Sequence, residues 1–378
     1  MKRNFICTLL LLSLPLISHA QTTLETDSAE SNQLGVSVDA LAFFRDNEYD
    51  SKMTKGYSLP GVWVRPALNY NPNSSIHLEA GFHALFFDGA NKYPNYAYHD
   101  IGTWKGNQYQ SGAHLLPWFR AQARIKKTTF VLGDIYGDLY HNIITPLYNK
   151  EQLMSADPEM GAQIIVDSRA AHVDLFLNWQ SYQFEEDTHQ EAFTVGLTSQ
   201  IKLTKELKAN INTLVQHRGG EQDITDMGVQ TLCNGAIGVE WLHETTGIID
   251  RCTAQLNAMG CYQQAGKLWQ FDSGFALHAE GGVDAWKHLL FRLGYFYAPK
   301  NFISLYGNPF FSTVSIRDGK QRFDGMRTGY LSVDYHYSFG KNYTFGANVE
   351  TFKVNSKGLN EFNFSFGLYI RVKPWFSL

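Results

Sequence analysis

The links between the alternating segments of this chain constrain its fold more than any other feature. After residue 33, about sixteen segments that alternate apolar and polar residues follow one another, joined in turn by a long link and a very short one. The long link 88–111 is followed by the turn Ile125-Lys126, and the long link 137–160 by the turn Arg169-Ala170. An even number of strands with long links on one side and tight turns on the other is typical of an antiparallel barrel that crosses a membrane.

The segments themselves agree with this interpretation. In Leu331–Phe339 the odd positions are apolar or aromatic and the even positions are polar, as expected for a strand with two different faces. A soluble β-sandwich also alternates in this way. However, most of the predicted strands, such as 267–281 and 284–298 around a turn at Gly282-Val283, have about ten residues or more, enough to cross a bilayer at a tilt. Strands of soluble proteins cluster near five or six residues.

The N-terminus predicts export. Lys2 and Arg3 precede an apolar stretch that ends at Ser18-His19-Ala20, so we predict a signal peptide over 1–20, a periplasmic segment over 21–33 and the barrel over 34–378. A membrane helix at this position would need about twenty apolar residues, and Pro15 interrupts the stretch. No later apolar run is long enough for a helical span, and strand ends are rich in Trp, Tyr and Phe, as membrane interfaces require.

The composition limits the partners. The formal charge of -4 becomes -6 when Lys2 and Arg3 leave with the signal peptide, which argues against nucleic acid as a ligand. The charged fraction of 18% is low beside the roughly 25% of soluble domains. We expect outer-membrane lipid around the chain and small polar solutes inside it.

The signal peptide, the sixteen amphipathic strands and the aromatic final segment Glu361–Trp375 resemble Gram-negative outer-membrane porins over essentially the whole mature chain. The resemblance implies an all-β, up-and-down barrel that serves as a passive or selective channel, without a cofactor. It also implies recognition by the barrel-assembly machinery, although the chain ends Trp375-Phe376-Ser377-Leu378 and not in an aromatic residue. It leaves the oligomeric state open.

Strand parity points a set of charged side chains into the lumen. Early strands contribute arginines and later strands contribute carboxylates, which would face each other and orient solutes with a transverse field. The alternative is that these charges fill a wet interior and pair locally. The predicted pore-lining residues are Arg45, Arg65, Arg120, Arg124, Glu240, Asp272, Glu280, Asp334 and Glu350.

Three long links are rich in aromatic rings, and we expect at least one of them to fold into the barrel as a partial plug. The residues predicted to constrict the pore are Tyr96, Trp104, Tyr148 and Phe310. Thr145-Pro146 predicts a helix start that leads into 147–155. Such rings stack on sugar faces, which would extend the predicted solutes to saccharides.

The sequence gives little indication of a catalytic or metal-binding site. The sequence has no Gly-x-Ser-x-Gly run, no metal-binding His or Cys spacing and no phosphate-binding loop, so we predict neither a catalytic residue nor a metal site. The alternatives to a channel are a plugged barrel that serves as a surface or assembly component, and an outer-membrane acyl hydrolase. Cys233, Cys252 and Cys261 are expected to remain unpaired, with Cys252 placed opposite about residue 239.

Overall fold

The computed structural model describes residues 32–89, 112–182, 190–220, 228–264, 268–317, 319 and 321–378. The predicted signal peptide and the loop residues Tyr96 and Trp104 lie outside the described residues. No helix in the described part of the chain is long and apolar enough to cross a membrane.

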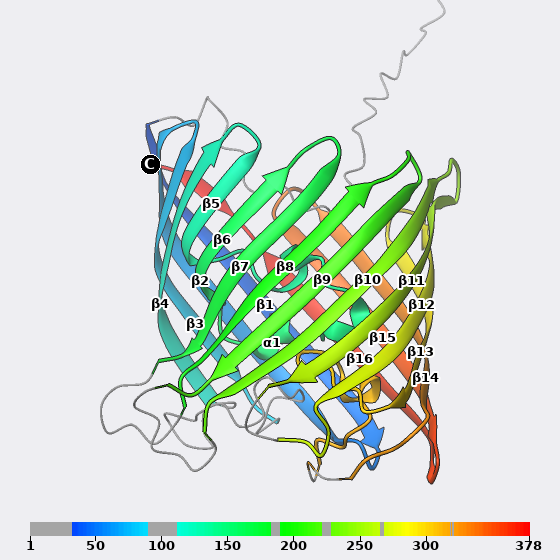
Figure 1. Cartoon of the computed structure of the whole chain (residues 1–378). Helices are drawn as coiled ribbons and strands as arrows, with labels where there is room; N and C mark the ends of the chain where they lie inside the picture. Colours follow the sequence, from blue (N-terminus) through cyan, green and yellow to red (C-terminus); the bar gives the residue numbers. More distant parts are fainter. Residues whose placement is uncertain are drawn as a thin grey trace, which may run out of the picture.

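Sixteen antiparallel strands form one closed sheet, the barrel of Figure 1. Each strand pairs with its neighbours in sequence, and β1 closes the circle by pairing with β16, with Phe44 opposite Leu368. A seventeenth strand, β17, extends the pairing of β1 at its first residues, with Gly35 opposite Ser377. The strands are β1 (Gln33–Asp50), β2 (Lys55–Asn73), β3 (Ile76–Phe87), β4 (Gly112–Ile125), β5 (Thr128–Asp134), β6 (Met160–Asp167), β7 (Ala171–Ser181), β8 (Ala192–Lys202), β9 (Leu207–Arg218), β10 (Gln230–Glu244), β11 (Ile249–Gln263), β12 (Ser273–Ala285), β13 (Leu289–Lys300), β14 (Met326–Phe339), β15 (Tyr343–Ser356), β16 (Leu359–Val372) and β17 (Trp375–Ser377).

The outer face of the barrel is apolar and the inner face is polar. On β16, Phe364 and Leu368 are 40% and 46% exposed, whereas Asn363 and Ser365, on either side of Phe364, are fully buried in the lumen. This inverts the pattern of a soluble protein and produces the belt that lipid tails require. The predicted outer-membrane barrel is therefore confirmed, including its even number of strands.

The two ends of the barrel differ as predicted. Short turns and the C-terminus lie at one end, shown at the top of Figure 1. The long links lie at the other end, together with two short links at 51–54 and 357–358. We call these the turn end and the loop end and assign them to the periplasm and the exterior.

The turn predicted at Gly282-Val283 is wrong. Gly282-Val283 lies inside β12, and the chain turns four residues later, at Trp286–His288. Trp286 and Lys287 both have positive φ, of 50° and 61°, the conformation of a tight hairpin turn. Gly282 has a different role, because a Cβ there would lie 2.8 Å from Cδ of Arg292 on the neighbouring strand. The glycine makes room for a lumen arginine and does not form a turn.

The apolar core lies inside the lumen, where two long links fold inward. The link between β5 and β6 carries the short helices η3 (Asp138–His141), η4 (Thr145–Leu147) and α1 (Gln152–Ser155), and the link between β13 and β14 carries η5 (Pro309–Phe311). Phe302, Phe310 and Phe311 of the second link are fully buried against Phe296 and Phe352 on the barrel wall. The prediction of at least one inserted loop is confirmed.

The helix predicted over 147–155 is wrong in its start and its length. Pro146 occupies an early position of η4 as predicted, but Ile144 is the N-cap residue and no side chain caps the helix. The hydroxyl of Thr145 instead donates to Glu280 of the wall at 3.1 Å.

Candidate functional site in the lumen

The two inserted links are joined to each other. Tyr148 and Tyr306 form a short parallel bridge and stack their rings at 6.4 Å between centroids. The carbonyl oxygen of Tyr306 accepts hydrogen bonds from the backbone of Asn149 at 2.8 Å and from Nε2 of Gln152 at 2.9 Å. The links between β5 and β6 and between β13 and β14 therefore form one unit, which we call the plug.

The plug is held against the wall by buried polar contacts. The Tyr306 hydroxyl hydrogen-bonds to Thr194 of β8 and to Gln180 of β7. Tyr148 and Phe310, which the sequence analysis predicts to constrict the pore, lie in the inserted links and are 8% and 0% exposed. Their burial makes them structural parts of the plug.

A second contact fixes the plug next to β7. His141 of η3 is fully buried, stacks on Phe176 at 3.5 Å between ring centroids, and contacts Asp174 at 2.7 Å and Glu159 at 3.0 Å. Burial disfavours the charged imidazole, but the two carboxylates prevail and raise the pKa of His141 to about 10. The sequence analysis missed this residue, because nothing in the chain near 141 reveals carboxylates that come from β7 and from residue 159.

A cavity of about 680 Å³ with many charged side chains in its wall lies between the plug and the later strands, and we call it cavity A. Five of the predicted pore-lining residues border it: Arg45, Glu240, Glu280, Asp334 and Glu350. Eight cationic side chains and four carboxylates line cavity A, so it is positive although the whole chain is acidic. Its cations are Arg45, Lys150, Lys208, Arg251, Arg292, Lys341, Arg371 and Lys373.

Several charges in cavity A pair locally. Because β1 closes onto β16, Arg45 reaches Glu350 at 2.5 Å and does not face it across the lumen; its Nε also lies 3.0 Å from Glu151 of the plug. Lys150 lies 3.7 Å from Asp334. The sequence analysis missed Lys150 and Glu151, although a charged pair inside an aromatic-rich link is a signal that could have indicated them.

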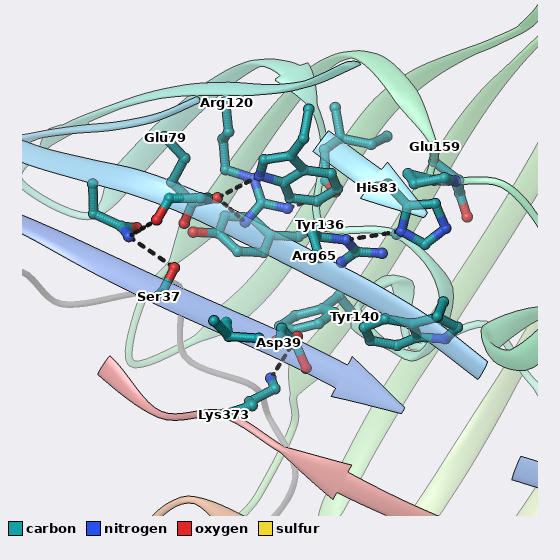
Figure 2. Close-up of a pocket in the computed structure, with 18 of the residues that line it drawn as sticks. Ser37, Asp39, Arg65, Glu79, His83, Arg120, Tyr136, Tyr140, Glu159 and Lys373 are labelled. Atoms are coloured by element: carbon teal, nitrogen blue, oxygen red, sulfur yellow. Dashed lines mark hydrogen bonds and ion pairs between the residues drawn. The ribbon is translucent and has the colours of Figure 1, made fainter. Parts of the chain in front are cut away.

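A second cavity of about 430 Å³, cavity B, lies against β1 to β4 and is drawn in Figure 2. Arg65 and Arg120, both predicted to line the pore, border it. Leu153, Arg371 and Lys373 line both cavities, which are therefore adjacent.

Guanidinium groups and aromatic rings alternate along the wall of cavity B. The guanidinium group of Arg120 lies 4.1 Å from the centre of the Tyr136 ring and 4.9 Å from the centre of the Trp118 ring. Arg65 lies 4.0 Å from the centre of the same Trp118 ring. Arg65 is in turn 4.7 Å from Trp63. Such stacking suits the flat, weakly hydrated guanidinium group.

Two predicted pore-lining residues border neither cavity. Arg124 lies at the turn end of β4. Asp272 precedes β12 and is exposed at the loop end, because that strand begins at Ser273 and not at 267 as predicted.

The cysteines are free, as expected, but their predicted register is wrong. Cys252 lies opposite His243, four residues beyond the predicted position, because the last pair of the hairpin is Glu244 with Arg251, which leaves six residues between the paired positions and not two. Within the described residues, no group of histidine, cysteine or carboxylate side chains could hold a metal ion.

Comparison with solved structures finds outer-membrane proteins with a similar fold. OccK5 (OpdH) of Pseudomonas aeruginosa is 11% identical, with a TM-score of 0.52 over 92% of this chain and 98% of that chain. OccAB2 of Acinetobacter baumannii is also 11% identical, with a TM-score of 0.52 over 91% and 98%. OprD of Pseudomonas aeruginosa is 10% identical, with a TM-score of 0.51 over 94% and 97%. At this identity, the likeness concerns the fold.

The sequence comparison gives a different kind of relationship. No curated protein matched the sequence. The profile of a family described as lipid A 3'-O-deacylase-type matches residues 26–378, which include all seventeen strands. Because this match spans nearly the whole chain, the protein belongs to the lipid A 3'-O-deacylase-type family.

Proposed function

We propose that the protein is an outer-membrane channel through which small polar solutes diffuse, with the plug as its constriction. The observation that carries this proposal is the pair of adjacent, charged cavities inside a closed barrel. A lumen that served only to hold the barrel together would be filled by side chains, as it is around Phe302 and Phe310. The extension to saccharides rests on aromatic side chains alone, and cavity B offers Trp63, Trp118 and Tyr140 for it.

Conductance tests the channel. Purified protein in planar bilayers is expected to produce discrete current steps in potassium chloride. A variant in which a short Gly-Ser linker replaces residues 303–316 is expected to conduct more, because the buried part of the second link is removed. Silent bilayers from protein that is correctly folded, both with the plug and without that segment, would refute the proposal and favour a closed barrel with a surface or assembly role.

The family description makes hydrolysis of an acyl ester of lipid A the second candidate. Such a reaction adds water to the ester, releasing a fatty acid and leaving a hydroxyl group on the sugar, and it needs a base that the lipid can reach. Among the described residues, four imidazoles with carboxylate partners point into the lumen and away from lipid: His77 with Glu79, His114 with Asp157, His141 with Asp174 and His172 with Asp167.

The outward-facing histidines in the described strands fit this chemistry less well. His217, near the loop end, stacks on Phe193, and His243 pairs with Glu206 at the turn end, which we assign to the periplasm. Mass spectrometry of lipid A from cells that express the protein would decide between the two candidates. Loss of one acyl chain relative to cells with an empty vector would favour the hydrolase.

A further inference from the structure

Arg65 differs from every other arginine on the wall of cavity B in having no carboxylate partner among the described residues. Its Nε donates to Nδ1 of His83 at 3.3 Å, and the structure gives no hydrogen bond for its two terminal nitrogens. In Figure 2 this guanidinium group lies in the middle of the cavity, next to His83. It lies 4.7 Å from the centre of the Trp63 ring and 4.0 Å from that of the Trp118 ring.

The nearby carboxylate is already engaged. Asp39 accepts two hydrogen bonds from Arg371, at 2.8 and 2.9 Å, and lies 3.4 Å from Nζ of Lys373. One carboxylate thus serves two cations, and Arg65 adds a third. The group formed by Asp39, Arg65, Arg371 and Lys373 therefore carries a net charge of +2. The other charged residues of the wall, Arg120, Glu79, Asp157 and Glu159, sum to -2, so the excess positive charge is local to the surroundings of Arg65.

Arg120, another arginine of the same wall, has the acceptors that Arg65 lacks. Arg120 donates to the backbone oxygens of Asp134 and Ile135 at 2.6 and 3.1 Å and lies 3.5 Å from Glu79. Arg65 has the same stacking but none of these acceptors. A second unused donor lies nearby. Because Nδ1 of His83 accepts the hydrogen bond from Arg65, the proton of the neutral ring is on Nε2. This Nε2 atom is buried and has no hydrogen-bond partner among the described residues.

A stacked guanidinium with free terminal nitrogens offers a rigid fork of N–H groups, and carboxylate and phosphate groups match this fork in shape and charge. We propose that cavity B binds a small solute through its carboxylate or phosphate oxyanion, with Arg65 as the binding group. Arg371 and Lys373 line both cavities and supply positive charge along the way from cavity A to this site. The role of the site in solute selection rests on the proposed channel function, whereas binding itself is independent of conduction.

Calorimetric titration of the refolded full-length barrel in zwitterionic detergent at low salt tests the proposal. The probes are succinate, inorganic phosphate and uncharged glycerol. Saturable binding of at least one anion is expected, and no binding of glycerol. Arg65→Gln is expected to weaken anion binding about tenfold or more, the effect of losing a charge-assisted hydrogen bond. Arg322→Gln is the matched control, because it removes an exposed arginine, paired with Asp324, outside both cavities.

A variant with the opposite effect guards against misfolding. Asp39→Asn frees Arg371 and Lys373 and is expected to tighten anion binding, which a damaged barrel would not do. Heat-dependent gel mobility verifies that each variant is folded. Binding only of phosphate or only of succinate assigns the oxyanion and supports the site. The proposal is overturned if neither anion binds, if glycerol binds as well as the anions, or if folded Arg65→Gln binds like the wild type. Conductance without anion binding would refute this site and leave the channel intact.

Discussion

Replacing His141 with Gln should destabilise the barrel more than any surface change, because it removes a cation from between two carboxylates in the lumen. Asp174 is 1% exposed and would keep only its hydrogen bonds from Gln163, at 3.0 and 3.1 Å. Removing one partner of a buried ion pair typically costs about 3–5 kcal/mol. The raised pKa leads to a similar magnitude, since a rise from 6.5 to about 10 corresponds to about 5 kcal/mol at 1.36 kcal/mol for each pH unit.

The direction of the pKa shift determines how the difference in unfolding free energy changes with pH. A histidine whose pKa is higher in the folded state stabilises that state fully below its unfolded pKa of 6.5. The stabilisation is lost as the pH rises towards about 10, where the folded imidazole also loses its proton. The difference in unfolding free energy between wild type and His141→Gln should therefore be largest near pH 6 and shrink steadily above it.

Urea unfolding from lipid vesicles, followed by tryptophan fluorescence at several pH values, measures this difference. His243→Gln is the matched control, because His243 and its partner Glu206 are both exposed at the turn end and their pair should contribute nothing measurable. Equal stability of wild type and His141→Gln at pH 6, or a difference that grows with pH, would show that His141 is neutral in the folded barrel.

Three further changes address the wall, the plug and the lipid face. Gly133→Ala should destabilise the barrel by about 1–3 kcal/mol in urea unfolding, because Gly133 has a φ of 89° and a Cβ would lie 2.2 Å from the Phe119 carbonyl oxygen. Gly329→Ala, with open space around the position, should be tolerated far better. Tyr306→Phe removes the hydroxyl contacts to the wall and should increase open-channel noise in bilayer recordings; an unchanged trace would mean that the ring alone holds the plug. Leu293→Arg places a charge on an outward position that is 67% exposed and should cost about 2–4 kcal/mol in vesicles if that position faces hydrocarbon.

Strand number and orientation could be predicted because they depend on local patterns. The alternation along Leu331–Phe339 is fixed by which face meets lipid, and each residue reports its own face. The prediction of the turn after β12 was wrong for a local reason. Glycine is common in turns, but Gly282 leaves space for the Arg292 side chain of the neighbouring strand. The inserted links were predicted from their aromatic content, because apolar rings must leave water.

The arrangement inside the lumen could be predicted only in part. Parity predicted that Arg45 faces the lumen, but its partners come from β15 and from the plug, far away in sequence. Parity also placed Arg65 and Arg120 in the lumen without showing that one has acceptors and the other has none. Which charges meet depends on barrel closure and on the path of two long links, and neither is encoded in the neighbouring residues.

The closure between β1 and β16 has a consequence for the order of assembly. The first strand to be synthesised obtains its second neighbour only from the last ones, so the contact of Arg45 with Glu350 spans a separation of 305 residues. Contacts of such long range make folding slow, because the chain must lose loop entropy before they form. The plug has a similar constraint, since Tyr148 meets Tyr306 only after most of the chain is available. The lumen therefore acquires its final shape late, and a chain truncated before β16 would lack both a closed wall and the carboxyl-terminal strand that pairs with β1.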